Sequence, residues 1–159
     1  MTAETIEQTL VPNLGRGLVV GVLPHPFCNP SVKGCGFCTS PHEGYSEPKA
    51  MAVTAAVTEE IEKFFADHAD LSGHRVEALY FGGGTANVTP VAAFRPLCHA
   101  LAGSLDLSGA EVTLEGVPAY FLDGGEERLD VLREQLVPQC FRVSMGIETF
   151  DKKQIRRMD

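Results

Sequence analysis

Four apolar segments alternate with segments of helical periodicity along this chain of 159 residues, and that alternation restricts the fold more than any other feature. The apolar segments, which we predict to be strands, cover residues 17–25, 76–84, 110–118 and 141–150. Apolar residues at helical spacing predict helices over residues 49–70, 89–103 and 126–137, and a further helix begins at residue 152. Strands that alternate with helices are typical of a parallel sheet with helical crossover connections. We therefore predict an α/β fold, a partial parallel (βα) barrel with about four βα units.

The sequence predicts one core domain with a short N-terminal extension. Residues 1–16 precede the first predicted strand and form an N-terminal extension, and residues 17–159 form the core domain. The last helix stops after about two turns, with nothing to cap its final carbonyl groups. Since four βα units cannot close a full barrel, we expect the core to be incomplete at its C-terminus. For the second helix, we expect Thr89 to be the N-cap and Pro90 to lie in the first turn.

Composition and charge exclude several classes of function. The chain is 44% hydrophobic and 21% charged, which is enough apolar content to bury a core. Its formal net charge of −8 disfavours a nucleic-acid partner, because phosphate binding needs a concentrated basic surface. No apolar segment approaches the roughly 20 residues of a membrane-spanning helix, and the acidic N-terminus does not resemble a secretion signal. We therefore expect a cytoplasmic protein, in which clustered thiols bind metal or do redox chemistry.

Three of the five cysteines lie close together in the segment "CNPSVKGCGFC". Cys28, Cys35 and Cys38 have the spacing C-x6-C-x2-C, and the C-x2-C pair lets two thiolates reach one metal from a tight turn. Three ligands are too few for a structural zinc site. They suit a [4Fe–4S] cluster that keeps one iron open. Zinc remains an alternative, with His25 or His42 as the fourth ligand.

A run of three glycines follows the second predicted strand, in "YFGGGTAN" at residues 80–87. Glycines at the end of a strand let the backbone approach a ligand and offer its N–H and C=O groups as hydrogen-bond partners. The alternative is a tight turn between strand and helix, which would need only one glycine. The Gly-Lys-Ser/Thr ending of a phosphate-binding loop is missing.

Four segments, in order, resemble the radical S-adenosylmethionine (SAM) enzymes, and within them the branch of oxygen-independent coproporphyrinogen dehydrogenase. "HPFCNPSVKGCGFC" is similar to the opening and cluster loop of that branch, and "YFGGGT" to its glycine motif. "VTLEGVP" and "RVSMGIETFD" are similar to its third and fourth strands. This chain departs from the branch in the first cysteine gap, which is six residues here. It also has glutamate where the branch has glutamine in the fourth strand.

The resemblance implies a role for each matching residue. Cys28, Cys35 and Cys38 would ligate three irons of a [4Fe–4S] cluster, and the fourth iron would bind SAM. Phe37 would lie beside the adenine, and Glu148 would face the ribose. The other residues implied in SAM binding are Gly82, Gly83, Gly84, Thr85, Glu115 and Ser144.

The resemblance also implies an activity. A radical SAM enzyme reductively cleaves SAM to a 5′-deoxyadenosyl radical, which abstracts a hydrogen atom from a small-molecule substrate. The electron would come from a reductant such as flavodoxin or ferredoxin. Two alternatives stay open: a non-catalytic zinc-binding module, and a carrier that keeps the cluster but delivers a cofactor such as haem.

Three further residues carry separate expectations. Cys98 and Cys140 lie in or beside apolar segments and are expected to be buried small side chains rather than ligands. His25, three residues before Cys28, is expected either to hydrogen-bond a cluster sulfur or to pack within its loop.

Overall fold

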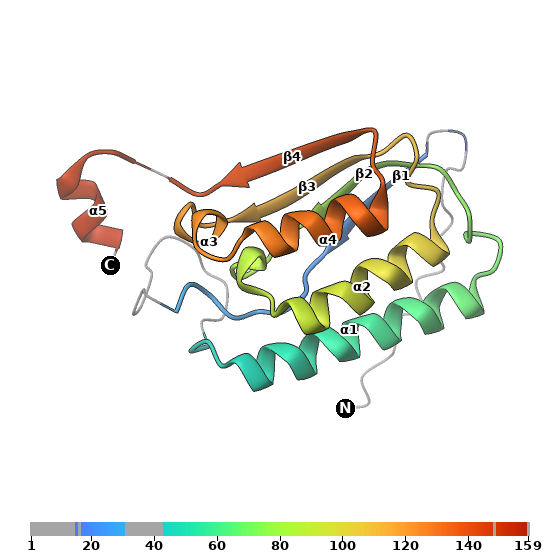
Figure 1. Ribbon diagram of the computed structural model, residues 1–159, viewed down its shortest axis with the longest axis horizontal. Helices are drawn as coiled ribbons and strands as arrows, with labels where there is room; N and C mark the ends of the chain where they lie inside the picture. The colour runs from blue at the N-terminus through green and yellow to red at the C-terminus, as the bar shows by residue number, and fades with distance from the viewer. Residues whose placement is uncertain (1–14, 16, 31–42, 148, 159) are drawn as a thin grey trace, which may run out of the picture.

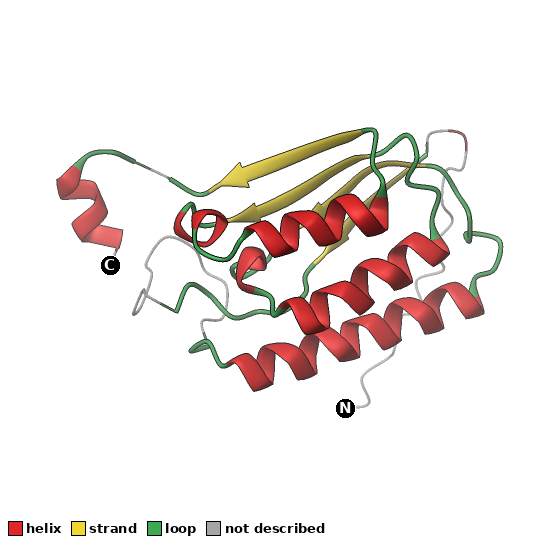
Figure 2. Ribbon diagram, viewed as in Figure 1, coloured by secondary structure: helices red, strands yellow, loops and turns green. Residues whose placement is uncertain are grey.

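The computed structural model describes residue 15 and residues 17–30, 43–147 and 149–158 (Figure 1). Its secondary structure is shown in Figure 2. In chain order, the elements are β1 (Leu18–Val22), α1 (Glu47–Asp67), β2 (Val76–Phe81), the 3₁₀ helix η2 (Ala86–Val88), α2 (Val91–Ser104), β3 (Glu111–Gly116), α3 (Ala119–Leu122), α4 (Glu126–Leu136), β4 (Cys140–Met145) and α5 (Lys152–Met158). The predicted order of strands and long helices is confirmed. The short helices η2 and α3 were not predicted.

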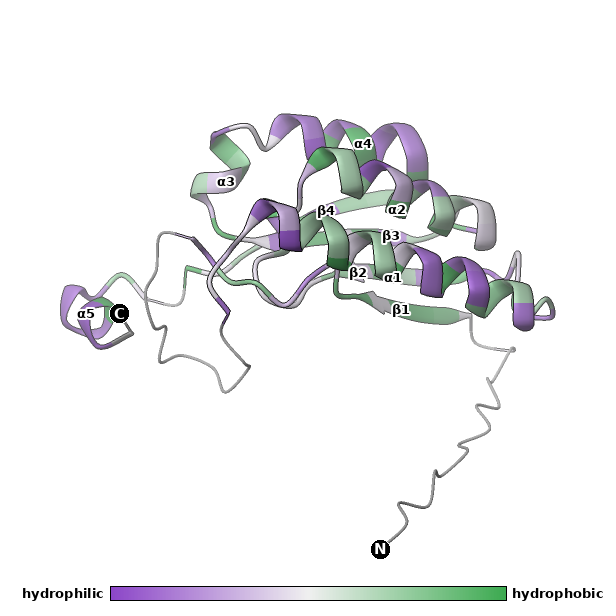
Figure 3. Ribbon diagram, turned by 90° about the horizontal axis from the view of Figure 1, so that it is seen from below, coloured by the Kyte–Doolittle hydropathy of each residue, from purple (hydrophilic) through white to green (hydrophobic). Residues whose placement is uncertain are grey.

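The four strands form one sheet in the order β1-β2-β3-β4, and every neighbouring pair is parallel. This confirms the α/β class and the parallel sheet. The helices α1, α2 and α4 all lie on one face of the sheet, as Figures 1 and 3 show. Because all four strands are parallel, their carboxyl ends lie at one edge of the sheet, where the segments after β1 and β2 come together (Figure 1).

Register separates the two faces of the sheet. One row across the strands is Val20, Leu79, Val112 and Phe141, and its side chains pack in the core against the helices. The next row is Gly21, Tyr80, Thr113 and Arg142, which alternation places on the opposite face. In the part of the chain that the structure describes, no helix covers that second face.

The core lies between β2, β3 and the helices α2 and α4. Phe94, Leu97 and Leu101 of α2 are buried against Phe81 and Leu114 of the sheet. The rings of Phe81 and Phe94 meet edge to face, with 5.2 Å between their centroids. Truncating one of these leucines to alanine would cost about 2–5 kcal/mol, because the cavity it leaves cannot collapse fully.

The start of α2 differs from the prediction. Pro90, not Thr89, is the N-cap residue, with φ −59° and ψ 132°. Thr89 closes the preceding 3₁₀ helix instead: its backbone N–H and its hydroxyl both donate to the carbonyl of Ala86, the hydroxyl at 2.7 Å. The Thr89 hydroxyl therefore bonds to a residue that precedes it, Ala86, and does not cap the first turn of α2.

Among the helices that the structure describes, none combines the length and apolar character needed to cross a bilayer.

Candidate functional site at the carboxyl ends of the strands

The carboxyl ends of the four strands bring together most of the predicted site residues that the structure describes. Cys28 follows β1, and residues 82–85 follow β2 directly. Glu115 and Ser144 lie near the ends of β3 and β4 and are paired in register. The other predicted residues, Cys35, Phe37, Cys38 and Glu148, lie outside the described residues, as does His42.

The glycine run packs against the segment that leads into the cysteines. The backbone N–H of Thr85 donates to the carbonyl of Phe27 at 2.9 Å. A Cβ atom on Gly84 would overlap that same carbonyl. Gly83 has φ +87°, a left-handed conformation that favours glycine, and a Cβ there would lie 2.9 Å from Cγ of Leu23. The two motifs are thus in direct backbone contact.

Gly82 has a separate reason to be glycine. A Cβ atom there would lie 2.7 Å from Cε1 of Tyr80 and 3.0 Å from Oε2 of Glu115. Each of the three positions is restricted by its neighbours, so close packing of a strand-to-helix turn, the alternative to a ligand site, already accounts for glycine at all three. Gly83 and Gly84 nevertheless remain exposed, so a ligand can still approach their backbone.

Asn87 joins the glycine segment to the end of β3. Its side chain is fully buried, and its Nδ2 donates to the carbonyl of Val117 at 2.9 Å. Its Oδ1 accepts the backbone N–H of Val117 at 3.1 Å. A Cβ atom on Gly116 would overlap the Asn87 amide. Asn87 was not predicted as a site residue, although it is the last residue of the segment "YFGGGTAN".

A polar cluster lies on the uncovered face of the sheet, next to these loops. Glu115 and Ser144 are both close enough to Tyr80 to act on its phenol. The pKa of Tyr80 is raised, mainly by burial and also by the Glu115 carboxylate, while a hydrogen bond with Ser144 lowers it. The structure thus brings the two predicted residues together around a tyrosine that sequence reasoning missed.

Arg142 lies on the same uncovered face, toward the amino ends of β3 and β4. Its Nε donates to the hydroxyl of Thr113 at 3.0 Å and lies 3.1 Å from Oε1 of Glu111. Because both partners belong to β3, the arginine ties β4 to β3 across the uncovered face. Its charge is already paired, so it is not available as an anion site.

His25 is the buried polar side chain closest in sequence to Cys28. The residue is 1% exposed, and by distance and angle neither ring nitrogen makes a well-formed hydrogen bond among the described residues. Burial lowers the pKa of His25 below its ordinary value, and this outweighs weaker hydrogen bonding to the backbone of His25 and Phe27, which raises the pKa. The imidazole is therefore neutral near pH 7, with one N–H to donate and one nitrogen to accept.

The remaining described cysteines differ in environment. Cys98 is fully buried in α2, as predicted, and burial raises the pKa of its thiol to about 12. Cys140 is exposed at the start of β4, so the prediction that it is buried is wrong. Alternation along β4 places Cys140 on the same face as Arg142, the face that no described helix covers. Neither cysteine is near the predicted cluster ligands in the sequence.

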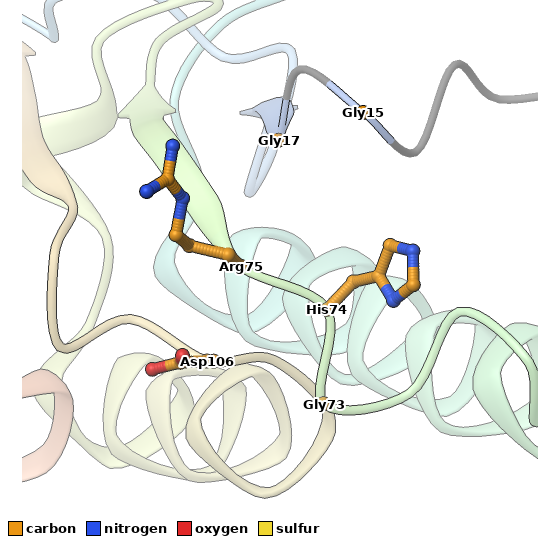
Figure 4. Close-up of a pocket in the computed structure, with 6 residues that line it drawn as sticks. All are labelled: Gly15, Gly17, Gly73, His74, Arg75 and Asp106. Carbon is orange, nitrogen blue, oxygen red and sulfur yellow. The ribbon is translucent and has the colours of Figure 1, made fainter.

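Two cavities lie elsewhere on the described structure. An apolar groove of about 870 Å³ runs between β1 and α1, where Val19 and Leu23 are 78% and 62% exposed. A smaller cavity of about 430 Å³ lies at the amino ends of the strands (Figure 4). The six residues that line it are Gly15, Gly17, Gly73, His74, Arg75 and Asp106.

The charges in the smaller cavity are satisfied locally. Arg75 is paired with Glu77, and Asp106 accepts hydrogen bonds from the hydroxyl and the backbone N–H of Ser108 at 2.7 and 3.1 Å. Figure 4 shows the His74 ring and the Arg75 guanidinium pointing in different directions. We therefore place the candidate site at the carboxyl ends.

Within the described ranges, no three His, Cys, Asp or Glu side chains group as a metal site. Two of the three predicted cysteine ligands fall outside those ranges. None of the protein-family models, curated proteins or solved structures compared with this chain matches it.

Proposed function

We propose that this chain is the core of a radical SAM enzyme, in which Cys28, Cys35 and Cys38 hold a [4Fe–4S] cluster that also binds SAM. In this proposal the four-stranded sheet is the first part of a parallel (βα) barrel. The protein works in the cytoplasm, takes electrons from a reductant such as flavodoxin or ferredoxin, and acts on a small molecule.

One observation carries most of the support: the glycine run and the entry to the cysteine segment are in direct contact. The Thr85–Phe27 hydrogen bond and the close approach at Gly84 bring these two motifs together at the carboxyl ends of β1 and β2. Ligand sites of parallel α/β folds lie at such strand ends. Buried His25, three residues before Cys28, makes no well-formed hydrogen bond through its ring nitrogens in the described residues, which is compatible with a group bound there.

The donor set fits such a cluster. Thiolates are the usual ligands of iron–sulfur clusters, and three of them leave one iron for another ligand. When bound, the cluster would supply the electron that cleaves SAM. The protein's task is then to hold the reactants and to exclude competing reactions.

The residues of this chain would position SAM. Gly83 and Gly84 have exposed backbone, so their polar groups can meet the amino end of the ligand. Glu115 lies over Gly82 and offers carboxylate oxygens as acceptors, and Ser144 opposite it offers a hydroxyl. Asn87 fixes the end of β3 and so holds Glu115 in place.

The test is anaerobic reconstitution with iron and sulfide, followed by electron paramagnetic resonance (EPR) of the reduced protein with and without SAM. We expect a [4Fe–4S]⁺ signal that changes when SAM is added. Cys35→Ala should abolish cluster assembly, because it removes one thiolate of the C-x2-C pair. Cys140→Ala is the matched control, since Cys140 is exposed and far along the chain, and it should keep full iron content.

Other outcomes separate the alternatives. Zinc in place of iron would refute the proposal and favour a structural zinc site. A cluster signal that is indifferent to SAM, with no 5′-deoxyadenosine formed, would favour a carrier of a cofactor such as haem.

A further inference from the structure

Tyr80 and Glu115 meet above the first residue of the glycine run. A Cβ atom on Gly82 would lie 2.7 Å from Cε1 of Tyr80 and 3.0 Å from Oε2 of Glu115, so the ring edge and the carboxylate flank the same point. Glycine at this position leaves the room that both side chains occupy. Because Gly83 and Gly84 are exposed beside it, the carboxylate lies next to backbone that a ligand can reach.

The parallel register explains why these side chains converge. Tyr80 pairs with Thr113, and Glu115 lies two residues after Thr113 on β3, so alternation places both on the uncovered face of the sheet. Ser144 pairs with Glu115 and belongs to the same face. The phenol of Tyr80 is thus flanked by a carboxylate from β3 and a hydroxyl from β4.

The Glu115 carboxylate has no cationic partner in the described part of the chain. None of the ion pairs formed by the described residues includes it. Arg142 lies on the same face, but its Nε is already engaged by Glu111 and Thr113. A half-buried carboxylate of this kind is suited to accept N–H donors from a positively charged ligand.

The phenol of Tyr80 is able to hold that carboxylate in place. Burial raises the pKa of Tyr80 and the Glu115 carboxylate raises it further, while hydrogen bonding to Ser144 and the charge of Arg142 lower it. The phenol therefore keeps its proton at neutral pH and has one O–H to donate. A donor beside a carboxylate fixes one of its oxygens and leaves the other for a ligand.

We propose that Tyr80 is a positioning residue, whose phenol holds the Glu115 carboxylate above Gly82 in the orientation that accepts the ammonium group of SAM. This inference rests on the proposed function and deepens it, because it names the side chain that orients one of the SAM-binding residues. In this role Tyr80 acts through Glu115 and makes no contact of its own with SAM.

The test measures SAM affinity by anaerobic calorimetry on proteins reconstituted with iron and sulfide. Tyr80→Phe keeps the ring and removes only the hydroxyl, and it should weaken SAM binding by about 10-fold. In a Glu115→Ala protein, the added Tyr80→Phe change should have little further effect, because the carboxylate that the phenol orients is gone. Tyr45→Phe is the matched control and should bind SAM as the native protein does, since the Tyr45 hydroxyl donates to the carbonyl of Val88 instead.

A second measurement needs neither iron nor SAM. Nuclear magnetic resonance of the metal-free native protein, labelled with ¹³Cζ-tyrosine, follows the titration of each phenol, and Tyr80→Phe assigns the Tyr80 signal. The pKa of Tyr80 should lie above the ordinary tyrosine value of about 10, and it should be lower in Glu115→Ala. An ordinary pKa in the native protein, or the same pKa in Glu115→Ala, would overturn the contact between the two side chains.

The outcomes separate the two proposals. If the EPR signal of the native protein changes with SAM but Tyr80→Phe binds SAM equally tightly, the role of Tyr80 is overturned and the proposed function stands. Equal losses from Tyr80→Phe with and without Glu115 would have the same meaning, because the phenol would then not act through the carboxylate. A native protein that assembles no iron–sulfur cluster and binds no SAM would overturn both.

Discussion

The Asn87 side chain joins two of the loops at the candidate site, and its removal is the sharpest test of the packing described above. Asn87→Ala deletes both hydrogen bonds to Val117 and leaves that residue's N–H and carbonyl without their partner. Removing one partner of a buried hydrogen bond costs about 1–3 kcal/mol for each group left without a partner. Because Val117 is only half-buried, water recovers part of this, so we expect a loss of about 2–4 kcal/mol.

Gly116 turns this into a stronger test. Gly116→Ala alone should destabilise the fold by about 1–3 kcal/mol, because its methyl group would overlap the Asn87 amide. In the Asn87→Ala protein that space is vacant, and the methyl group fits. The double variant should therefore be more stable than the sum of the two losses predicts, by about 1 kcal/mol or more.

The assay is urea unfolding of all four proteins of this cycle, followed by circular dichroism. Gln139→Ala, at an exposed position, is the control and should stay within about 0.5 kcal/mol of the native protein. Strictly additive losses, or an Asn87→Ala protein as stable as the control, would refute the geometry that places the amide against Gly116 and Val117.

Three further predictions concern single side chains. Gly83→Ala should lower the free energy of unfolding by about 1 kcal/mol or more, because Gly83 has a positive φ and a Cβ there would press on Leu23. Gly103→Ala should raise the free energy of unfolding by about 0.5–1 kcal/mol, since open space surrounds that position in α2. Urea midpoints that fall in the reverse order would contradict both. A thiol reagent at pH 8 should modify exposed Cys140 much faster than Cys98, whose pKa is raised to about 12 by burial, and equal rates would count against the burial of Cys98. In the metal-free protein, the lowered pKa of His25 means that the unfolded state binds more protons than the folded state below about pH 6.5. The free energy of unfolding should therefore fall as the pH drops from 7 to 5, and it should fall less in His25→Gln. An identical pH profile for the two proteins would contradict the burial of His25 as a neutral group.

The order of strands and long helices could be predicted because the apolar periodicity of each segment is strong. The first and last residues of the elements were harder to predict. For example, β1 ends at Val22 rather than at residue 25, because Pro24 has no N–H to continue the hydrogen bonds of a strand. Thr89 fits an N-cap by residue type alone, yet its hydroxyl bonds backward to Ala86. Local sequence does not distinguish these two uses of a threonine.

The position of the candidate site residues at the strand ends could be predicted, but the contacts between those residues could not. The glycines and Cys28 were placed at strand ends by the fold class alone, and the pairing of Glu115 with Ser144 follows from parallel register. The roles of Asn87 and Tyr80 depend on contacts between segments far apart in the chain. A single sequence carries no signal for such contacts.

The uncovered face of the sheet limits what can pack against it. Its row of Tyr80, Thr113 and Arg142, with Glu111 and Glu115 beside it, is too polar for a purely apolar partner. On the β3–β4 side, a segment that covered this face would have to supply hydrogen-bond partners or leave water in place. Toward β1 the same face carries the exposed apolar side chains of Val19 and Leu23, which need apolar contacts instead. The two halves of this face therefore call for different covering residues.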